Sequence, residues 1–176
     1  MNRPPKDSLQ QIKQRRDAAL EALAVGVPYI QFLGISFERR GDELTALLPF
    51  RDMLIGNPVL PALHGGVTAA FLEVTAIVGL GWASLWDEIE SGAVDAAALA
   101  TGKAAGATLP RLPRTIDFTV DYLRSGLPRD AYARAEVTRS GRRYASVLVE
   151  AWQDNRARPF AHGLGHFVMP QRGEAG

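Results

Sequence analysis

The sequence predicts an α+β protein in which one antiparallel β-sheet wraps around a long central helix, with an extra helix at the N-terminus. Residues 64 to about 86 repeat apolar side chains at helical spacing on both sides, so this helix has no polar face for solvent. The segments before and after it alternate as strands and are separated by turn residues. Such strands bury the helix by curling around it as a single sheet.

The composition fits one soluble domain with a sizeable core. The chain has 176 residues, 47% of them hydrophobic and 22% charged, and its formal net charge of +1 predicts no nucleic-acid or membrane partner. The absence of cysteine excludes disulfides, thiolate catalysis and Cys-ligated metals, and the three histidines lack the spacing of a metal site. Residues 1–14 lack the apolar segment of a signal peptide, so we expect a cytoplasmic protein.

The elements follow in a simple order. We expect a tail and helix over residues 1–27, with Ser8 and Gln11 forming a capping-box pattern, then the main domain over 28–170 and a tail over 171–176. Residues 29–32 read as a short turn, 51–63 as a connecting loop, and 87–107 as a surface loop or a flap beside the site. The predicted strands are residues 33–39, 44–50, 112–124, 129–139, 142–153 and 157–169.

Glu73 is the first candidate for chemistry. It is the only ionisable side chain between His64 and Asp87, and it lies in a helix that should be wrapped by protein. A glutamate is rarely buried unless it is paired or functional. It either reaches the flank of the helix and binds a partner side chain, or it serves as a nucleophile or general base; we favour the second role.

The pair Gly65-Gly66 is the second candidate. Two glycines at the start of a helix expose backbone N–H groups, and the helix dipole helps them to bind an anion or polarise a carbonyl oxygen, although the pair also fits an ordinary turn. Glu73 lies eight residues after Gly65, which is roughly 12 Å along a helix axis. One helix therefore cannot easily bring both groups to one atom. Two helices packed antiparallel across a two-fold axis can, so the spacing predicts a dimer with shared sites.

The same stretch resembles a known family. His-Gly-Gly, followed by small and apolar residues and by an acidic residue nine positions after the histidine, resembles the hotdog-fold acyl-CoA thioesterases. The similarity is greatest to the PaaI-like group of phenylacetate degradation and to the 4-hydroxybenzoyl-CoA thioesterases, and it covers residues 29–169 approximately. It implies a hotdog fold and an acyl-CoA substrate, with no cofactor beyond the coenzyme A of the substrate. It also implies edge-to-edge dimers that pair into a homotetramer.

The resemblance assigns roles to individual residues. Gly65 would polarise the thioester carbonyl, and Glu73 of the partner subunit would attack it or activate water, two roles that the sequence leaves open. His64 and Asn57 would position the substrate, and Thr115 would orient the carboxylate or the water unless it is an ordinary β-branched strand residue. The expected substrate and CoA contacts are Gly66, Arg124, Arg142 and Arg143, the last two in a glycine-arginine turn.

Two other functions remain open. Residues 56–61 resemble the proline-rich loop of the β-hydroxyacyl dehydratases, but those enzymes have a histidine just before it, where this chain has Leu54 and Ile55. A dehydratase or hydratase acting on acyl thioesters is therefore the weaker choice. A non-catalytic acyl-CoA-binding protein would keep the pocket but would not need Glu73. The sequence does not identify the acyl group.

Overall fold

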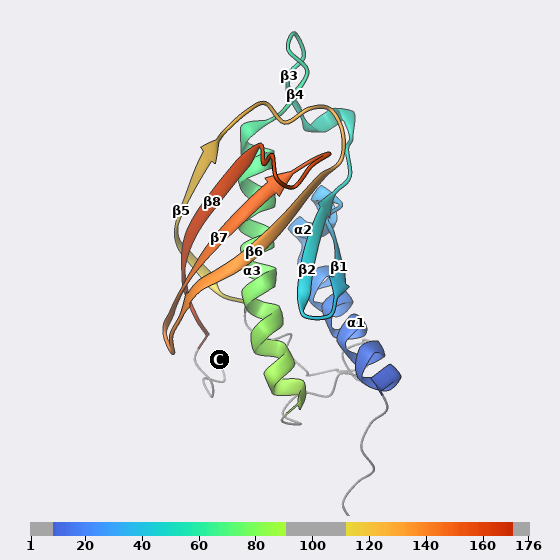
Figure 1. Ribbon diagram of the computed structural model, residues 1–176, viewed down its shortest axis with the longest axis vertical. Coiled ribbons are helices and arrows are strands. Elements are labelled where there is room, and N and C mark those ends of the chain that lie inside the picture. The colour runs from blue at the N-terminus through green and yellow to red at the C-terminus, as the bar shows by residue number, and fades with distance from the viewer. Residues whose placement is uncertain (1–8, 91–111, 171–176) are drawn as a thin grey trace, which may run out of the picture.

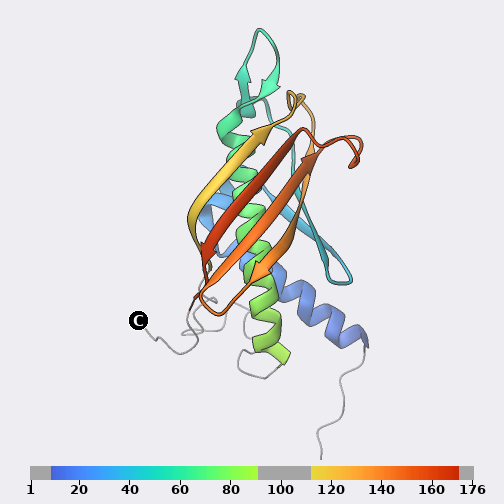
Figure 2. The same ribbon diagram turned by 60° about the vertical axis from the view of Figure 1, so that its left-hand side comes forward.

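The computed structural model describes residues 9–90 and 112–170, which form a curved sheet wrapped around one long helix (Figures 1 and 2). The helices are α1 (Leu9–Val25), α2 (Pro28–Leu33), the 3-10 helix η1 (Asp52–Leu54) and α3 (Gly65–Glu90). The strands are β1 (Ser36–Arg40), β2 (Glu43–Leu48), β3 (Ile55–Asn57), β4 (Ala62–Leu63), β5 (Arg114–Tyr122), β6 (Ala131–Ser140), β7 (Tyr144–Trp152) and β8 (Ala161–Val168). The main sheet has the order β1-β2-β6-β7-β8-β5, and its neighbouring strands are antiparallel. The predicted α+β architecture is confirmed.

Two local predictions are corrected. Residues 51–63, expected as a loop, contain η1 and a two-stranded ribbon of β3 and β4 in which Ile55 pairs with Leu63. Strands of three and two residues are too short to show an alternating pattern, so they could not be predicted from periodicity. Residues 87–90, also expected as a loop, continue α3, while residues 91–107 lie outside the described part of the chain.

Helix α3 supplies the core that the sheet encloses. Phe71, Leu72, Val78 and Leu85 are fully buried. The segment Gly65–Leu85 is long and apolar enough to cross a membrane by length and composition, but 56% of an 18-residue apolar window within it is buried inside this fold, as in a core helix. One stripe of α3 is only partly covered. It contains Ala69, Ala70, Glu73 and Ile77, which recur at intervals of three and four residues and therefore share one face.

Helix α1 packs against the C-terminal half of α3 and beside β1. Its Leu20 and Leu23 are buried in the core. The guanidinium of Arg39, in β1, donates two hydrogen bonds to the Asp17 carboxylate of α1, at 2.8 and 3.1 Å. The predicted N-terminal helix is thus present, and it flanks the β1 edge of the sheet.

Strand β5 contains a bulge that changes which side chains face α3. Thr115 pairs with Phe167, but Asp117 pairs with the preceding residue of β8, His166, so Ile116 is an extra residue without a partner. In a regular strand, side chains two residues apart lie on the same face, so Thr115 would share the outer face with Asp117. The extra residue moves it instead to the inner face, together with Phe118.

Phe118 occupies space that β8 leaves free. A Cβ atom on Gly163 would lie 2.6 Å from the Phe118 ring, and one on Gly165 would lie 2.5 Å from it. The ring therefore lies directly over two glycines of the neighbouring strand, an arrangement in which an aromatic side chain covers exposed glycine backbone. This packing anchors β5 just after its bulge.

Gly163→Ala should lower the free energy of unfolding by about 1–3 kcal/mol, because the new methyl group would overlap the Phe118 ring. Urea denaturation of Gly163→Ala, Phe118→Ala and the double variant measures this effect. The alanine at 163 should cost less in the Phe118→Ala background, where the ring is absent. Equal costs in the two backgrounds would show that the overlap is not the cause.

Candidate active site

The N-terminus of α3 is capped by the histidine that precedes it. The backbone N–H of Gly66 donates a hydrogen bond to Nδ1 of His64 at 2.9 Å, which is the contact of an N-cap residue with the second residue of a helix. Because Nδ1 accepts this bond, the neutral imidazole carries its proton on Nε2. His64 is exposed, so Nε2–H is available as a donor. Gly66, predicted as a substrate contact, thus has its N–H engaged within the chain.

The N–H of Gly65 has no acceptor among the residues that the structure describes. It is the first residue of α3, so it lacks an intrahelical partner and points out of the N-terminal end of the helix. Its carbonyl accepts a hydrogen bond at 2.9 Å from the hydroxyl of Tyr122, at the end of β5. This bond holds the first peptide of α3 in place and leaves one backbone donor, aided by the helix dipole, for a ligand oxygen.

Glu73 lies on the partly covered stripe of α3, where Thr115 holds its carboxylate. The Thr115 hydroxyl donates a hydrogen bond at 2.6 Å to Oε1 of Glu73. Both side chains are partly buried, and Oε2 has no partner among the described residues. The bulge at Ile116 is what places this hydroxyl on the inner face of the sheet. Glu73 is therefore oriented through one oxygen, and its second oxygen remains available.

The two ends of β5 hold the two halves of the candidate site. Tyr122, at one end, bonds to Gly65, and Thr115, at the other end, bonds to Glu73. Gly65 and Glu73 belong to one continuous helix, so they remain separated by roughly 12 Å along its axis. The described protomer therefore presents the Gly65 N–H donor and the Glu73 carboxylate at two separate places.

The β3–β4 ribbon leads directly into this site. His64 follows β4, and its N–H bonds to the Leu54 carbonyl at 2.8 Å. A Cβ on Gly56 would lie 2.7 Å from Cα of His64, so only glycine allows this approach. Asn57 directs Oδ1 to the N–H groups of Val59 and Leu60, at 3.0 and 3.3 Å, and its predicted contact with substrate remains a prediction.

The predicted phosphate-binding arginines are exposed and lie at opposite ends of β5. Arg124 follows β5 near Tyr122 and therefore near Gly65. Arg142 and Arg143 form the turn before Tyr144. Tyr144 pairs with Val168 of β8, and Val168 pairs on its other side with the first residue of β5. The two arginines thus lie at the Thr115 end of the strand. One protomer does not bring the three arginines together.

The other two histidines lie on the outer face of the sheet, away from α3. Nδ1 of His166 is 2.8 Å from Oδ1 of Asp117, and Nε2 of His162 is 3.8 Å from Oε1 of Glu150. Within residues 9–90 and 112–170, no three His, Asp or Glu side chains converge as metal ligands do. These cross-strand pairs are separate from Glu73, and they contribute nothing to the candidate site.

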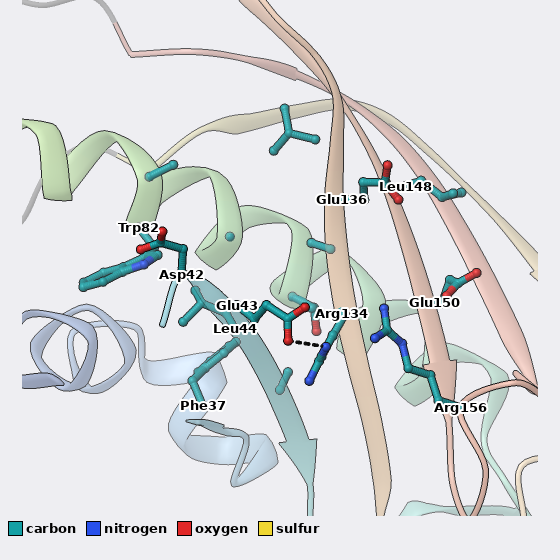
Figure 3. A pocket seen from close by; sticks show the side chains of 16 residues that line it. Phe37, Asp42, Glu43, Leu44, Trp82, Arg134, Glu136, Leu148, Glu150 and Arg156 are labelled. Carbon is teal, nitrogen blue, oxygen red and sulfur yellow. Dashed lines mark hydrogen bonds and ion pairs between the residues drawn. The ribbon is translucent and has the colours of Figure 1, made fainter. Parts of the chain in front are cut away.

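The cavity shown in Figure 3, of about 400 Å³, lies on the opposite side of α3 from Glu73. Strand β2 pairs with β6 only through its residues 46–48. At the start of β2, where the two strands are no longer paired, the Arg134 guanidinium of β6 donates a hydrogen bond to the Glu43 carboxylate at 2.7 Å. Thr75 and Trp82 of α3 line the cavity, and they are rotated by roughly 180–200° from Glu73 around the helix axis. The cavity is thus a gap between diverging strands, and it does not contain the candidate catalytic groups.

Two residues that support the site were not singled out from the sequence. Tyr122 was counted only as part of a strand, although its inward position follows from the alternation of Phe118, Val120 and Tyr122. Gly56 was noted only within the proline-rich loop, and no pattern in the chain reveals its contact with His64. Both fix the backbone on which the Gly65 donor depends.

Comparisons with known proteins find similarity to acyl-CoA thioesterases. A family model described as the acyl-CoA thioesterase N-terminal domain matches residues 91–168. The medium/long-chain acyl-CoA thioesterase YigI of Escherichia coli (strain K12) is 33% identical over 135 residues, covering 74% of this chain and 78% of that protein.

Solved structures give the same fold. A protein from Shewanella oneidensis related to the thioesterase superfamily has a TM-score of 0.64 and 27% identity, over 92% of this chain and 99% of that one. A phenylacetic acid degradation-related protein from Ralstonia eutropha has a TM-score of 0.59 and 18% identity, over 86% and 99% of the two chains.

The chain belongs to the hotdog-fold acyl-CoA thioesterases, and it is a thioester hydrolase. The resemblance that was read from His64-Gly65-Gly66 and Glu73 is confirmed at the level of family and fold. The family match begins after Glu73, so it does not by itself assign the catalytic residues.

His64→Ala should lower the free energy of unfolding by about 1 kcal/mol, because the Gly66 N–H would lose its acceptor. His64→Asn should retain most of the stability, since asparagine is a good N-cap residue. Urea denaturation of both variants measures the difference. If they are equally destabilised, capping is not what His64 contributes to stability.

Proposed function

We propose that this protein hydrolyses medium- to long-chain acyl-CoA thioesters, with Glu73 as the nucleophile or general base. The observation that carries the proposal is the Glu73 carboxylate, which Thr115 holds on an otherwise apolar stripe of α3. A carboxylate placed among small and apolar side chains is suited to reaction, because water does not screen it fully. The chain-length class rests on the name of the YigI relative.

The Gly65 N–H would bind the thioester carbonyl oxygen. Negative charge develops on that oxygen when the carbonyl carbon is attacked, and a fixed backbone donor at a helix N-terminus stabilises it. The Tyr122 bond to the Gly65 carbonyl keeps this donor oriented. His64 Nε2–H, fixed by the bond at Nδ1, would donate to the substrate, and the amide nitrogen of Asn57 would help to position it.

Glu73 would act from a second protomer. Because α3 separates Gly65 from Glu73, we propose that two helices pack antiparallel through their partly covered stripes, so that each helix offers its carboxylate to the other's Gly65. Glu73 then either attacks the carbonyl carbon or removes a proton from a water that attacks it; in both cases the C–S bond breaks and CoA leaves as the thiol. No metal or further cofactor enters this scheme.

The same pairing would explain the positions of the arginines. Arg124 lies at the Gly65 end of β5, whereas Arg142 and Arg143 lie at the Thr115 end. An antiparallel pair of protomers brings the Gly65 end of one to the Glu73 end of the other. Arg124 of one protomer and the arginine turn of the other would then border one site and bind the CoA phosphates.

Removing the Gly65 donor should lower kcat for acyl-CoA hydrolysis by about 10²–10³-fold. Gly65→Pro deletes the N–H at the first helical position, where proline is well tolerated, and Gly65→Ala is the matched control that keeps it. Alanine fits, since its Cβ would lie 3.4 Å from the Tyr122 hydroxyl. Thiol release is the measurement, and equal activity of the two variants would exclude Gly65 as the carbonyl donor.

Glu73→Gln should reduce thiol release by about 10²–10⁴-fold while keeping the acceptor for Thr115. Mixing unfolded Glu73→Gln and Gly65→Pro chains, both nearly inactive, and refolding them together should restore about one quarter of the wild-type rate. Half of the dimers are then mixed, and each mixed dimer has one intact site. Co-refolded chains that stay inactive although mixed dimers form would show that the site is not shared.

A further inference from the structure

The β3–β4 ribbon, whose base adjoins His64, carries two apolar residues into solvent at its tip. Val59 and Leu60 are 85% and 71% exposed, the two highest values among the exposed large hydrophobic residues. The ribbon stands clear of the sheet at the N-terminal end of α3 (Figures 1 and 2). Among the described residues nothing covers this adjacent apolar pair, which makes it a candidate contact for a ligand or another molecule.

The tip is also held in one conformation. Oδ1 of Asn57 accepts hydrogen bonds from the N–H groups of both Val59 and Leu60. Pro58 and Pro61 flank the tip, and each restricts its own φ angle. A contact surface that is already ordered loses little conformational freedom when it binds, so it can select between ligands by shape and polarity.

The chemistry of the tip matches one arm of a thioester. A carbonyl bound to the Gly65 N–H has the acyl chain on one side and the CoA thiol arm, with its phosphates, on the other. Residues 53–63 contain no ionisable side chain, so the ribbon offers no cation to phosphate. It offers methionine, valine and leucine side chains, and the exposed Met53 lies at its base. An apolar chain is the partner whose contact with this surface is favourable, because the contact removes apolar area from water.

We propose that Val59 and Leu60 contact the acyl chain of the substrate whose carbonyl is bound at Gly65, and that they set the preference for longer chains. This inference rests on the proposed function. The Gly65 N–H points out of the helix end at which the ribbon stands, and Leu60 is five residues before Gly65, so the tip lies within about 18 Å of the carbonyl. The proposal therefore predicts contact with the tip for longer acyl chains and none for chains as short as butanoyl.

The test compares chain-length selectivity in matched variants. Val59→Ser/Leu60→Ser removes the apolar tip, and Val25→Ser, at a site 59% exposed at the end of α1, is the control for loss of an exposed valine. The ratio of kcat/KM for dodecanoyl-CoA to that for butanoyl-CoA should fall about tenfold in the tip variant, mainly through KM. The ratio for Val25→Ser should equal that of the wild type.

Each other outcome overturns the inference. An unchanged ratio means that the tip does not contact the chain. Equal losses for both substrates, with a change in oligomeric state by light scattering, assign the tip to contact between protomers. A loss seen only with substrate in phosphatidylglycerol vesicles assigns it to a lipid surface. If the wild type hydrolyses acyl-CoA and Glu73→Gln does not, the proposed function stands even where the chain-length ratio is unchanged in the tip variant. If the wild type is inactive on acyl-CoA of every chain length, both the proposed function and the inference about the tip are rejected.

Discussion

The rigidity of one helix decides how this site can be built. Gly65 and Glu73 are fixed to the same straight element, and no side-chain rotation closes the separation between them. The strand that crosses the helix reinforces the separation, because Tyr122 bonds at one end and Thr115 at the other. Within one chain the two groups are therefore kept apart by the core packing itself. This separation is the reason for proposing that the reactive arrangement forms between two protomers.

The positions of the two groups depend on features at the edge of the sheet. The bulge at Ile116 turns the Thr115 hydroxyl towards α3, and the Phe118 ring, seated on Gly163 and Gly165, holds the strand immediately after the bulge. At the other end, Gly56 admits His64 close enough to cap the helix. The site thus depends on glycines that a larger residue could not replace and on the extra residue of the β5 bulge.

The sequence predicted the long helix and the six strands of the main sheet because their apolar periodicity extends over many residues. It also singled out Glu73 and Gly65 as candidates, because an isolated acid and a glycine pair interrupt an apolar pattern. It did not predict the β3–β4 ribbon, whose strands are too short to alternate, or the extra residue at Ile116. No local pattern contains the bond from Tyr122 to Gly65, because the two residues lie far apart in the chain. The contact of Gly56 with His64 is also absent from any local pattern, because it depends on shape alone.

The contact between α1 and β1 has a consequence for solubility. A β-sheet has two edges, and each unpaired edge can recruit a strand from another molecule. Here the Asp17–Arg39 ion pair holds a helix beside one edge, while β5 forms the other. A helix held at this place hinders a strand of another molecule at the β1 edge, so strand addition between copies of this chain is expected at the β5 edge, where two molecules can pair. Losing the first helix would remove that hindrance and expose both edges to other molecules.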